Sequence, residues 1–128
     1  MTMKYLIAAV CLALALAGCA PGNESAAFRQ VNAQTAMELM QTEENAQIVD
    51  VRTEAEYAEG HIPGAICIPN ESIGTGPVPE LPDLDQTILV YCRSGRRSKQ
   101  AAQKLADLGY TNVVEFGGIQ DWTGPTVS

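Results

Sequence analysis

The 128-residue sequence is poor in basic residues and contains a single histidine, His61. Eight lysines and arginines stand against fifteen aspartates and glutamates, so the formal net charge is −7. Because nucleic-acid binding depends on a basic surface that contacts phosphates, this balance argues against DNA or RNA as a partner. The four cysteines form no CxxC pair, which excludes a zinc finger and most metal cages. We therefore expect no metal and no cofactor.

Long apolar runs are also missing. The apolar run at residues 5–17 would span about 20 Å as a helix, which is short of the roughly 30 Å hydrocarbon core of a bilayer. Lys4 stands before this run and small residues follow it, a pattern typical of a secretory signal. The composition of the full sequence is that of one ordinary globular domain, since 46% of its residues are hydrophobic and 18% are charged.

The end of the apolar run carries a more specific motif. Leu16, Ala17, Gly18 and Cys19 resemble the lipobox of bacterial lipoproteins, in which cleavage leaves the cysteine as a lipid-carrying first residue. The resemblance implies a cell-envelope protein anchored through Cys19, and Ala20 favours the outer membrane, with the domain facing the periplasm. Several acyl chains together give stable anchoring. The alternative is an ordinary signal peptide with a chance cysteine.

The lipoprotein interpretation divides the chain into three parts: a signal peptide at 1–18, a lipidated cysteine and tether at 19–27, and a domain at 28–126. The mature net charge would be −8, because one lysine and no acidic residue leaves with the signal. Cys67 and Cys92 would remain in the domain. An oxidising compartment permits a disulfide between them, but two cysteines alone do not predict one.

The domain alternates strand-like and helix-like segments. Apolar, β-branched runs predict strands at residues 28–31, 48–51, 65–68, 87–91 and 113–116. Strands separated by helices indicate a parallel sheet that is covered on both faces. The predicted fold class is therefore α/β, with a parallel sheet of about five strands and helices on both faces.

Helix signals lie between these strands. Capping-box sequences predict that helices begin at 35–38 and 53–56, the second of them ending near Gly60. A longer helix is expected from Ser98, with Gly109 as its stop, and a short terminal helix that includes Trp122. Residues 69–86 contain four prolines and read as a long surface loop that could partly cover a site, whereas residues 117–118 break the chain before the terminal helix.

A candidate site lies where the strand at 87–91 ends. Cys92 stands there, and a short polar loop follows it before the helix: Arg93, Ser94, Gly95, Arg96, Arg97 and Ser98. Ligands of parallel α/β sheets bind at the carboxyl ends of strands. A tight loop that enters a helix also directs several backbone N–H groups at one point and favours an anion there.

The charge of this segment suits a reactive thiol. Five of the seven basic residues of the mature chain lie between Arg93 and Lys104, without an acidic residue among them. Amide dipoles and guanidinium groups stabilise a thiolate, so we expect the pKa of Cys92 to lie below its ordinary value. Such a thiolate is a nucleophile at neutral pH without a histidine base.

Four segments of the sequence form a recognisable set: CRSGRR at 92–97, IVDVR at 48–52, EGHIPGA at 59–65 and GGIQDW at 117–122. Together they resemble the rhodaneses, the thiosulfate:cyanide sulfurtransferases. Their order and spacing match a single rhodanese domain and cover nearly all of residues 28–123. The resemblance implies that Cys92 takes a sulfur atom from thiosulfate, carries it as a persulfide, and passes it to cyanide or a thiol.

The same resemblance suggests roles for the loop. Arg93 and Arg97, then Arg96, would attract the anionic donor and stabilise the sulfite that leaves. Backbone N–H groups from Ser94 to Ser98 would hold the sulfur.

Two other functions stay open. Cell-cycle phosphatases and arsenate reductases share this fold, but their loops are one residue longer and would need an arginine where Ser98 stands. A persulfide carrier or binding module, which delivers sulfur to a protein partner, is the second alternative. It would load sulfur readily and release it slowly to cyanide.

Four further residues invite smaller hypotheses. Asp50 and Arg52 either shape the floor of the pocket or form a buried salt bridge that supports the loop, and we favour the salt bridge. His61 is expected to orient its turn by hydrogen bonding rather than to act as an acid or base. Cys67 is expected to be a small core residue, with a role in resolving the Cys92 persulfide as the alternative.

Overall fold

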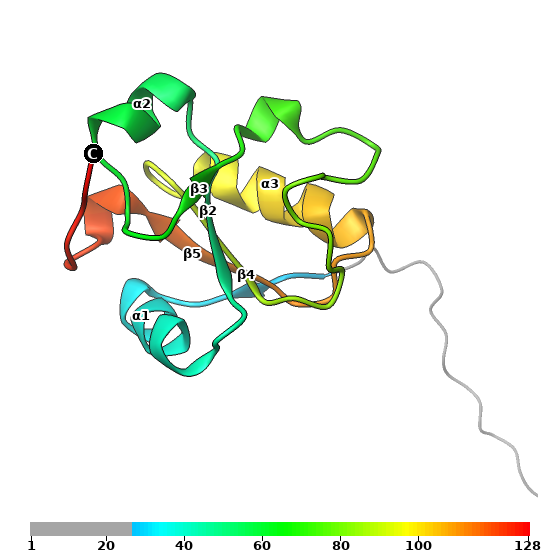
Figure 1. Ribbon diagram of the computed structural model, residues 1–128, viewed down its shortest axis with the longest axis horizontal. Coiled ribbons are helices and arrows are strands. Elements are labelled where there is room, and N and C mark those ends of the chain that lie inside the picture. Colours follow the sequence, from blue (N-terminus) through cyan, green and yellow to red (C-terminus); the bar gives the residue numbers. More distant parts are fainter. Residues whose placement is uncertain (1–26) are drawn as a thin grey trace, which may run out of the picture.

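The computed structural model describes residues 27–128, in which five parallel strands form a sheet of order β1-β5-β4-β2-β3 (Figure 1). The strands are β1 (Arg29–Gln30), β2 (Gln47–Asp50), β3 (Ile66–Cys67), β4 (Ile88–Cys92) and β5 (Val113–Gly118). The predicted fold class is confirmed. The signal peptide, Cys19 and nearly all of the tether lie outside the described residues.

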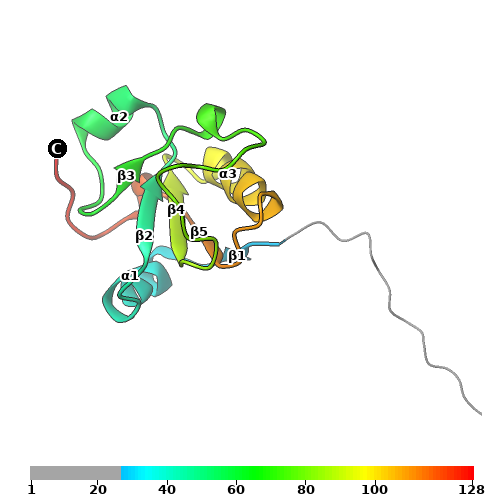
Figure 2. The same cartoon turned by 45° about the vertical axis from the view of Figure 1, so that its right-hand side comes forward.

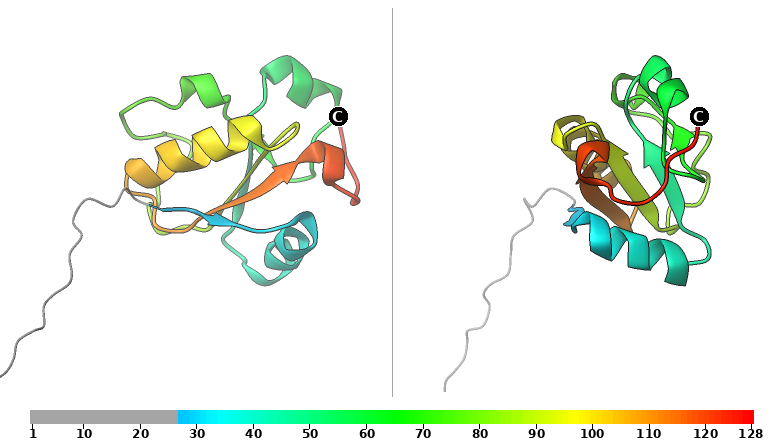
Figure 3. Two further views of the ribbon diagram at one scale, coloured as in Figure 1. Left: turned by 180° about the vertical axis from the view of Figure 1, so that it is seen from behind. Right: turned by 90° about the vertical axis from the view of Figure 1, so that its left-hand side faces the viewer.

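Helices lie on both faces of the sheet. The α-helices are α1 (Ala33–Thr42), α2 (Glu54–Glu59) and α3 (Arg96–Asp107), and the short 3-10 helices are η2 (Asn70–Ser72) and η3 (Ile119–Asp121). Figure 2 and Figure 3 show α1 on one side of the sheet and α3 on the other. No helix within residues 27–128 is both long and apolar enough to cross a membrane.

The central strand β4 is buried on both faces. Its alternate residues Ile88, Val90 and Cys92 pack in the cluster that includes α3, whereas Leu89 and Tyr91 pack in the cluster that includes α1. All five have no exposed surface. A parallel strand covered on both sides needs such a continuous apolar sequence, which is why β4 was recognisable from the sequence.

The two predicted capping boxes have different outcomes. The box at the start of α2 is confirmed, because the Thr53 hydroxyl accepts from the Glu56 amide (3.2 Å) and the Glu56 carboxylate accepts from the Thr53 amide (3.0 Å). The box at the start of α1 is wrong. Asn32 caps that helix by accepting from the Thr35 amide (2.8 Å), so α1 begins two residues before Thr35. Asparagine is at least as good an N-cap as threonine.

Three element boundaries around the candidate site also differ from expectation. Helix α3 begins at Arg96 rather than Ser98, because Gly95 adopts the left-handed region (φ +106°) and turns the chain into the helix directly. Strand β5 continues through Gly118, where a side chain would overlap the Arg93 carbonyl group. The terminal turn is η3, which Trp122 follows rather than joins.

The segment 69–86 packs more closely than a surface loop. Ile73, Val78 and Leu81 are buried in the cluster beside α3, and the Tyr110 hydroxyl donates to the Leu81 carbonyl (2.7 Å). The loop therefore supplies part of the core, which makes the surface-loop prediction wrong for these three residues. No periodic pattern marks them in the sequence.

Candidate functional site

Cys92 lies at the carboxyl end of the central strand, where the chain turns from β4 into α3. Gly95 and Ser98 are buried in this turn, whereas the side chains of Arg93 and Arg96 are exposed. Residues 92–98 thus form a loop that closes around the Cys92 sulfur, as the sequence predicted for this strand end. We call this segment the Cys92 loop.

Hydrogen-bond donors of the Cys92 loop surround the sulfur. The Gly95 amide donates to Sγ over 3.0 Å, and the Ser98 Oγ lies 3.4 Å from Sγ. Burial alone would raise the pKa of the thiol, but hydrogen bonds from the Ser98 side chain and three backbone amides outweigh burial. These amides belong to Ser94, Gly95 and Ser98. The pKa of Cys92 therefore lies below its ordinary value, although the residue has no exposed surface.

The three arginines of the loop differ in their partners. Arg97 forms an ion pair with Glu56 of α2, with Nη1–Oε1 at 2.8 Å and Nη2–Oε2 at 3.1 Å. Arg93 and Arg96 pair with no carboxylate of residues 27–128. The sequence ranked Arg97 above Arg96 as an anion ligand, but the structure leaves Arg93 and Arg96 as the arginines with uncompensated charge.

A buried carboxylate lies next to the Cys92 loop, on β5. Glu115 is 2% exposed, and its Oε2 accepts from the Ser98 hydroxyl (2.5 Å) and from the Gly117 amide (2.9 Å). The Ser98 hydroxyl therefore lies between the Cys92 sulfur and this carboxylate. Sequence analysis missed Glu115, although a charged residue inside an apolar strand was an available signal.

Asp50 and Arg52 form the buried salt bridge that we favoured. The Arg52 Nη2 and Asp50 Oδ2 atoms are 2.7 Å apart, and Arg52 also donates to the Gly60 carbonyl (2.7 Å). The Tyr91 hydroxyl donates to Asp50 Oδ2 (2.7 Å) and accepts from the Ile62 amide (3.1 Å). The pair thus reaches Cys92 only through its neighbour Tyr91, which packs on the opposite face of β4. This geometry gives no support to the pocket-floor interpretation.

His61 lies in the turn after α2. Its Nδ1 hydrogen bonds with the Tyr57 carbonyl (2.8 Å), its ring stacks on the Tyr57 ring, and its backbone pairs with Val127. These contacts agree with the expected role in orienting the turn.

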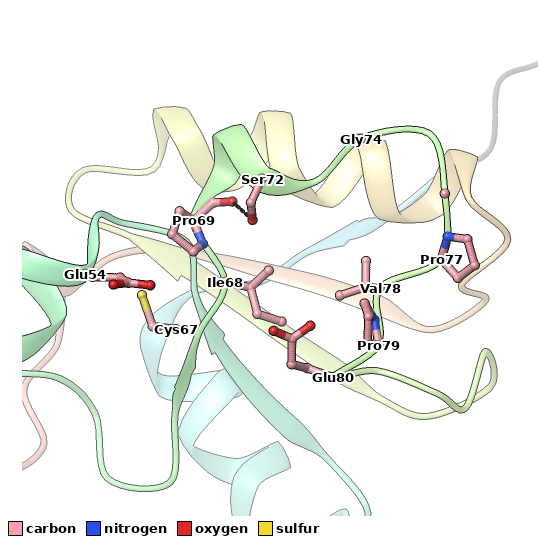
Figure 4. A pocket seen from close by; sticks show the side chains of 11 residues that line it. Glu54, Cys67, Ile68, Pro69, Ser72, Gly74, Pro77, Val78, Pro79 and Glu80 are labelled. Atoms are coloured by element: carbon pink, nitrogen blue, oxygen red, sulfur yellow. Dashed lines mark hydrogen bonds between the residues drawn. The ribbon is translucent and has the colours of Figure 1, made fainter.

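Cys67 lines a cleft of about 540 Å³ between β3 and the segment 69–86 (Figure 4). In Figure 4 its sulfur lies beside the Glu54 carboxylate, and no residue of the Cys92 loop lines the cleft. Cys67 is only partly buried, so it is less buried than the predicted core residue would be. Burial, followed by the negative charges of Asp50 and Glu54, raises the pKa of Cys67 to about 11.

The same position argues against Cys67 as a partner of Cys92. Strand β2 separates β3 from β4, so the two cysteines stand two strand spacings apart, about 10 Å. A disulfide needs Cα atoms within about 7 Å, and both thiols are free. Within residues 27–128 no cluster of three or more histidine, cysteine and acidic side chains could hold a metal ion.

Comparisons with known proteins assign this domain to a family. Residues 32–125 match the rhodanese-like domain family. The chain is similar to the thiosulfate sulfurtransferase PspE of Escherichia coli, with 39% identity over 62% of this chain and 76% of that protein. It is also similar to a sulfurtransferase of Allochromatium vinosum, with 36% identity over 73% of this chain and 86% of that protein.

Solved structures agree with the sequence relatives. A rhodanese from E. coli, solved with anions, superposes with a TM-score of 0.60 and 37% identity over 65% of this chain and 98% of that chain. The protein therefore belongs to the rhodanese-like family, and it carries a single domain of that kind in the residues matched.

Proposed function

We infer that the protein is a thiosulfate sulfurtransferase, in which Cys92 carries the transferred sulfur as a persulfide. One observation carries this inference: the buried Cys92 sulfur lies within a loop whose amide groups point at it, at the amino end of α3. The similarity to enzymes named as thiosulfate sulfurtransferases supports the choice of donor.

The first half-reaction is a displacement at sulfur. The Cys92 thiolate attacks the outer sulfur of thiosulfate, so that an S–S bond to Sγ forms. The S–S bond of thiosulfate breaks with its electron pair on the leaving sulfite. The new terminal sulfur carries one negative charge, which the amides of the Cys92 loop are placed to stabilise.

The second half-reaction restores the thiolate. Cyanide or a thiolate acceptor attacks the terminal sulfur, the S–S bond to Sγ breaks, and its electron pair returns to Cys92. Arg93 and Arg96 have exposed cationic side chains at the loop, which suits the recognition of anionic donors and acceptors.

Intact-mass spectrometry of the purified protein tests this function. After treatment with thiosulfate, we expect the protein to gain one sulfur atom and to lose it when cyanide is added. Cys92→Ser should gain none, whereas the matched variant Cys67→Ser should behave as the parent does. Sulfur transfer by Cys92→Ser would contradict the assignment. Loading that cyanide reverses only slowly would indicate the persulfide carrier instead.

We also propose that the protein is a lipoprotein of the bacterial outer membrane, anchored through Cys19 and facing the periplasm. The lipobox-like residues 16–19 and the alanine after them support this proposal. Metabolic labelling with a fatty acid should label the protein, and Cys19→Ser should abolish the label while Cys11→Ser, within the signal, retains it. Label on Cys19→Ser, or recovery in the inner-membrane fraction, would contradict the proposal.

A further inference from the structure

Glu115 is a buried acid without a cationic partner. Its carboxylate accepts from three neutral groups: the Ser98 hydroxyl, the Gly117 amide and the Gln30 side chain, whose Nε2 lies 3.3 Å from Oε1. The ion pairs of residues 27–128 are Arg52–Asp50 and Arg97–Glu56, and neither includes Glu115. Glu115 therefore interacts with the rest of the site through these hydrogen bonds and not through an ion pair.

The Ser98 hydroxyl links this carboxylate to Cys92, and it has a single hydrogen to donate. Its oxygen lies near three acceptors: Glu115 Oε2 (2.5 Å), the Gly95 carbonyl (3.1 Å) and the Gly117 carbonyl (3.4 Å). The Cys92 thiol in turn donates to Ser98 Oγ over 3.4 Å. A carboxylate attracts this hydrogen most strongly, because hydrogen bonds to charged acceptors are the stronger ones. While its hydrogen points at Glu115, Ser98 presents only lone pairs to the sulfur, which suits a thiol. The Ser98 hydroxyl stabilises the thiolate only when that hydrogen turns to the sulfur.

Protonation of Glu115 reverses this arrangement. A neutral carboxyl group can donate its own hydrogen to Ser98 Oγ, and the Ser98 hydrogen is then free to point at the Cys92 sulfur. The thiolate therefore gains a donor at Ser98 only when Glu115 is neutral. The carboxylate and the thiolate also repel each other directly, since both groups are buried and the Ser98 Oγ lies within hydrogen-bonding distance of each.

We propose that Glu115 is a positioning residue of the sulfur site, which shares one proton with Cys92 through the Ser98 hydroxyl. The exchange is balanced: Cys92 gives its S–H proton to Ser98 Oγ while Ser98 gives its own proton to Glu115 Oε2. One negative charge moves from the carboxylate to the sulfur, and no oxidant or reductant takes part. The proposal rests on the proposed function only where it treats Cys92 as the reacting group.

The other charged groups at the site are few. Arg97 interacts electrostatically with Cys92 and is held by Glu56, and Arg93 and Arg96 are exposed. From β1, the side chain that contacts Glu115 is the neutral Gln30. Glu115 is thus the acid that hydrogen bonds into the Cys92 loop from within the core. An anionic Glu115 opposes the thiolate, so removal of its charge should favour the thiolate.

The test is Glu115→Gln, which removes the charge and keeps the shape. The glutamine oxygen still accepts from Gly117, and Gln30 can turn its amide to accept from the new NH₂ group. A neutral amide oxygen holds the Ser98 hydrogen less strongly than a carboxylate does, so this hydrogen can turn to the charged sulfur. The measurement is the rate of Cys92 alkylation by iodoacetamide as a function of pH, read at Cys92 by peptide mass spectrometry. We expect the midpoint to fall by about one pH unit, so that alkylation on the acid side becomes about tenfold faster. An unchanged or higher midpoint overturns the proposal.

Two comparisons isolate the route through Ser98. Glu80→Gln removes an exposed acid elsewhere on the surface and should leave the midpoint unchanged. In a Ser98→Ala background, the shift caused by Glu115→Gln should fall to less than half, because the hydroxyl that couples the groups is absent. A shift of the same size in that background overturns the role of Ser98.

The parent protein, without any substitution, provides a second measurement should Glu115→Gln fail to fold. Coupling between two protonation sites is reciprocal, so blocking Cys92 with iodoacetamide should lower the pH at which the infrared band of a buried carboxyl group disappears. No change in that band on blocking overturns the proposal. Neither measurement uses thiosulfate, so either can fail while the sulfur-loading test succeeds, and the reverse also holds.

Discussion

The properties of Cys92 are set by the groups within hydrogen-bonding distance of its sulfur. Three backbone amides and the Ser98 hydroxyl lower the pKa of the thiol against the opposing effect of burial. The three amides are fixed in place by the backbone of the loop and the first turn of α3, so they need no rearrangement when negative charge appears on the sulfur. The arginines differ, because Arg93 and Arg96 extend into solvent. Their contribution should therefore lie in binding the donor.

The first prediction follows from this division of roles. Arg93→Ala should raise KM for thiosulfate about fivefold, which corresponds to the roughly 1 kcal/mol of an exposed charge interaction, and should change KM for a neutral persulfide donor much less. Steady-state kinetics with both donors measures this. Lys99→Ala is the matched control, because Lys99 is an exposed cation of the following helix, α3, and lies outside the Cys92 loop. Equal effects of Arg93→Ala on both donors would count against recognition of the anion.

At the scale of elements, Glu56 connects α2 to the Cys92 loop. Its carboxylate completes the capping box of α2 and also pairs with Arg97 in the first turn of α3. The hydrogen bond from Arg97 is the main reason that the pKa of Glu56 falls to about 2, and Thr53 adds to it. Because the pKa is lower in the folded protein than in the unfolded chain, the ionised form of Glu56 stabilises the fold.

The second prediction separates the two roles of Glu56. Glutamine can serve in a capping box but cannot pair as an anion, so Glu56→Gln should lower the free energy of unfolding at pH 7 by up to about 1 kcal/mol, the range of partly exposed ion pairs. Glu56→Ala loses the cap as well and should cost about 1 kcal/mol more.

The contribution of Glu56 to the free energy of unfolding depends on pH. The stabilisation is fully present above the ordinary glutamate pKa of about 4.3 and is lost as the pH falls toward 2. Urea unfolding at pH 7 and at a series of acid pH values measures it. A stability difference between the parent and Glu56→Gln that stays constant down to pH 2 would contradict the ion-pair explanation.

At the scale of the whole molecule, the sequence was most informative where contacts are local. The apolar run of β4, the capping box at Thr53 and the loop that follows Cys92 are each contiguous, so their patterns predicted the sheet and the position of Cys92 at the end of β4. The start of α1 was wrong because Asn32 and Thr35 are both good N-caps and local sequence does not choose between them.

Contacts between distant segments were the ones the sequence did not reveal. Glu115 meets Ser98 across 17 positions and Arg97 meets Glu56 across 41 positions, and neither pairing has a local pattern. Both pairings arise because parallel strands bring their carboxyl ends to one edge of the sheet. The buried residues of the segment 69–86 escaped prediction for the same reason, since they pack against α3 rather than against their neighbours in sequence.

The charge of the whole molecule has two opposing effects on a thiosulfate dianion, one from its net value and one from its distribution. The chain carries a net charge of −7, which repels the anion, but its basic residues are concentrated around the Cys92 loop, which attracts it. Distance decides between them: at 0.1 M ionic strength the screening length is about 10 Å, so the loop arginines act on a bound or approaching donor while most acidic groups are screened.

The third prediction is therefore that kcat/KM for thiosulfate falls several-fold as ionic strength rises from about 0.1 M to about 1 M, where the screening length is near 3 Å. A neutral persulfide donor should show little dependence, and Arg93→Ala should flatten the dependence for thiosulfate. Steady-state kinetics in a non-reacting salt measures all three. If kcat/KM instead rises with salt, repulsion of thiosulfate by the overall negative charge outweighs its attraction by the loop arginines, which contradicts the prediction.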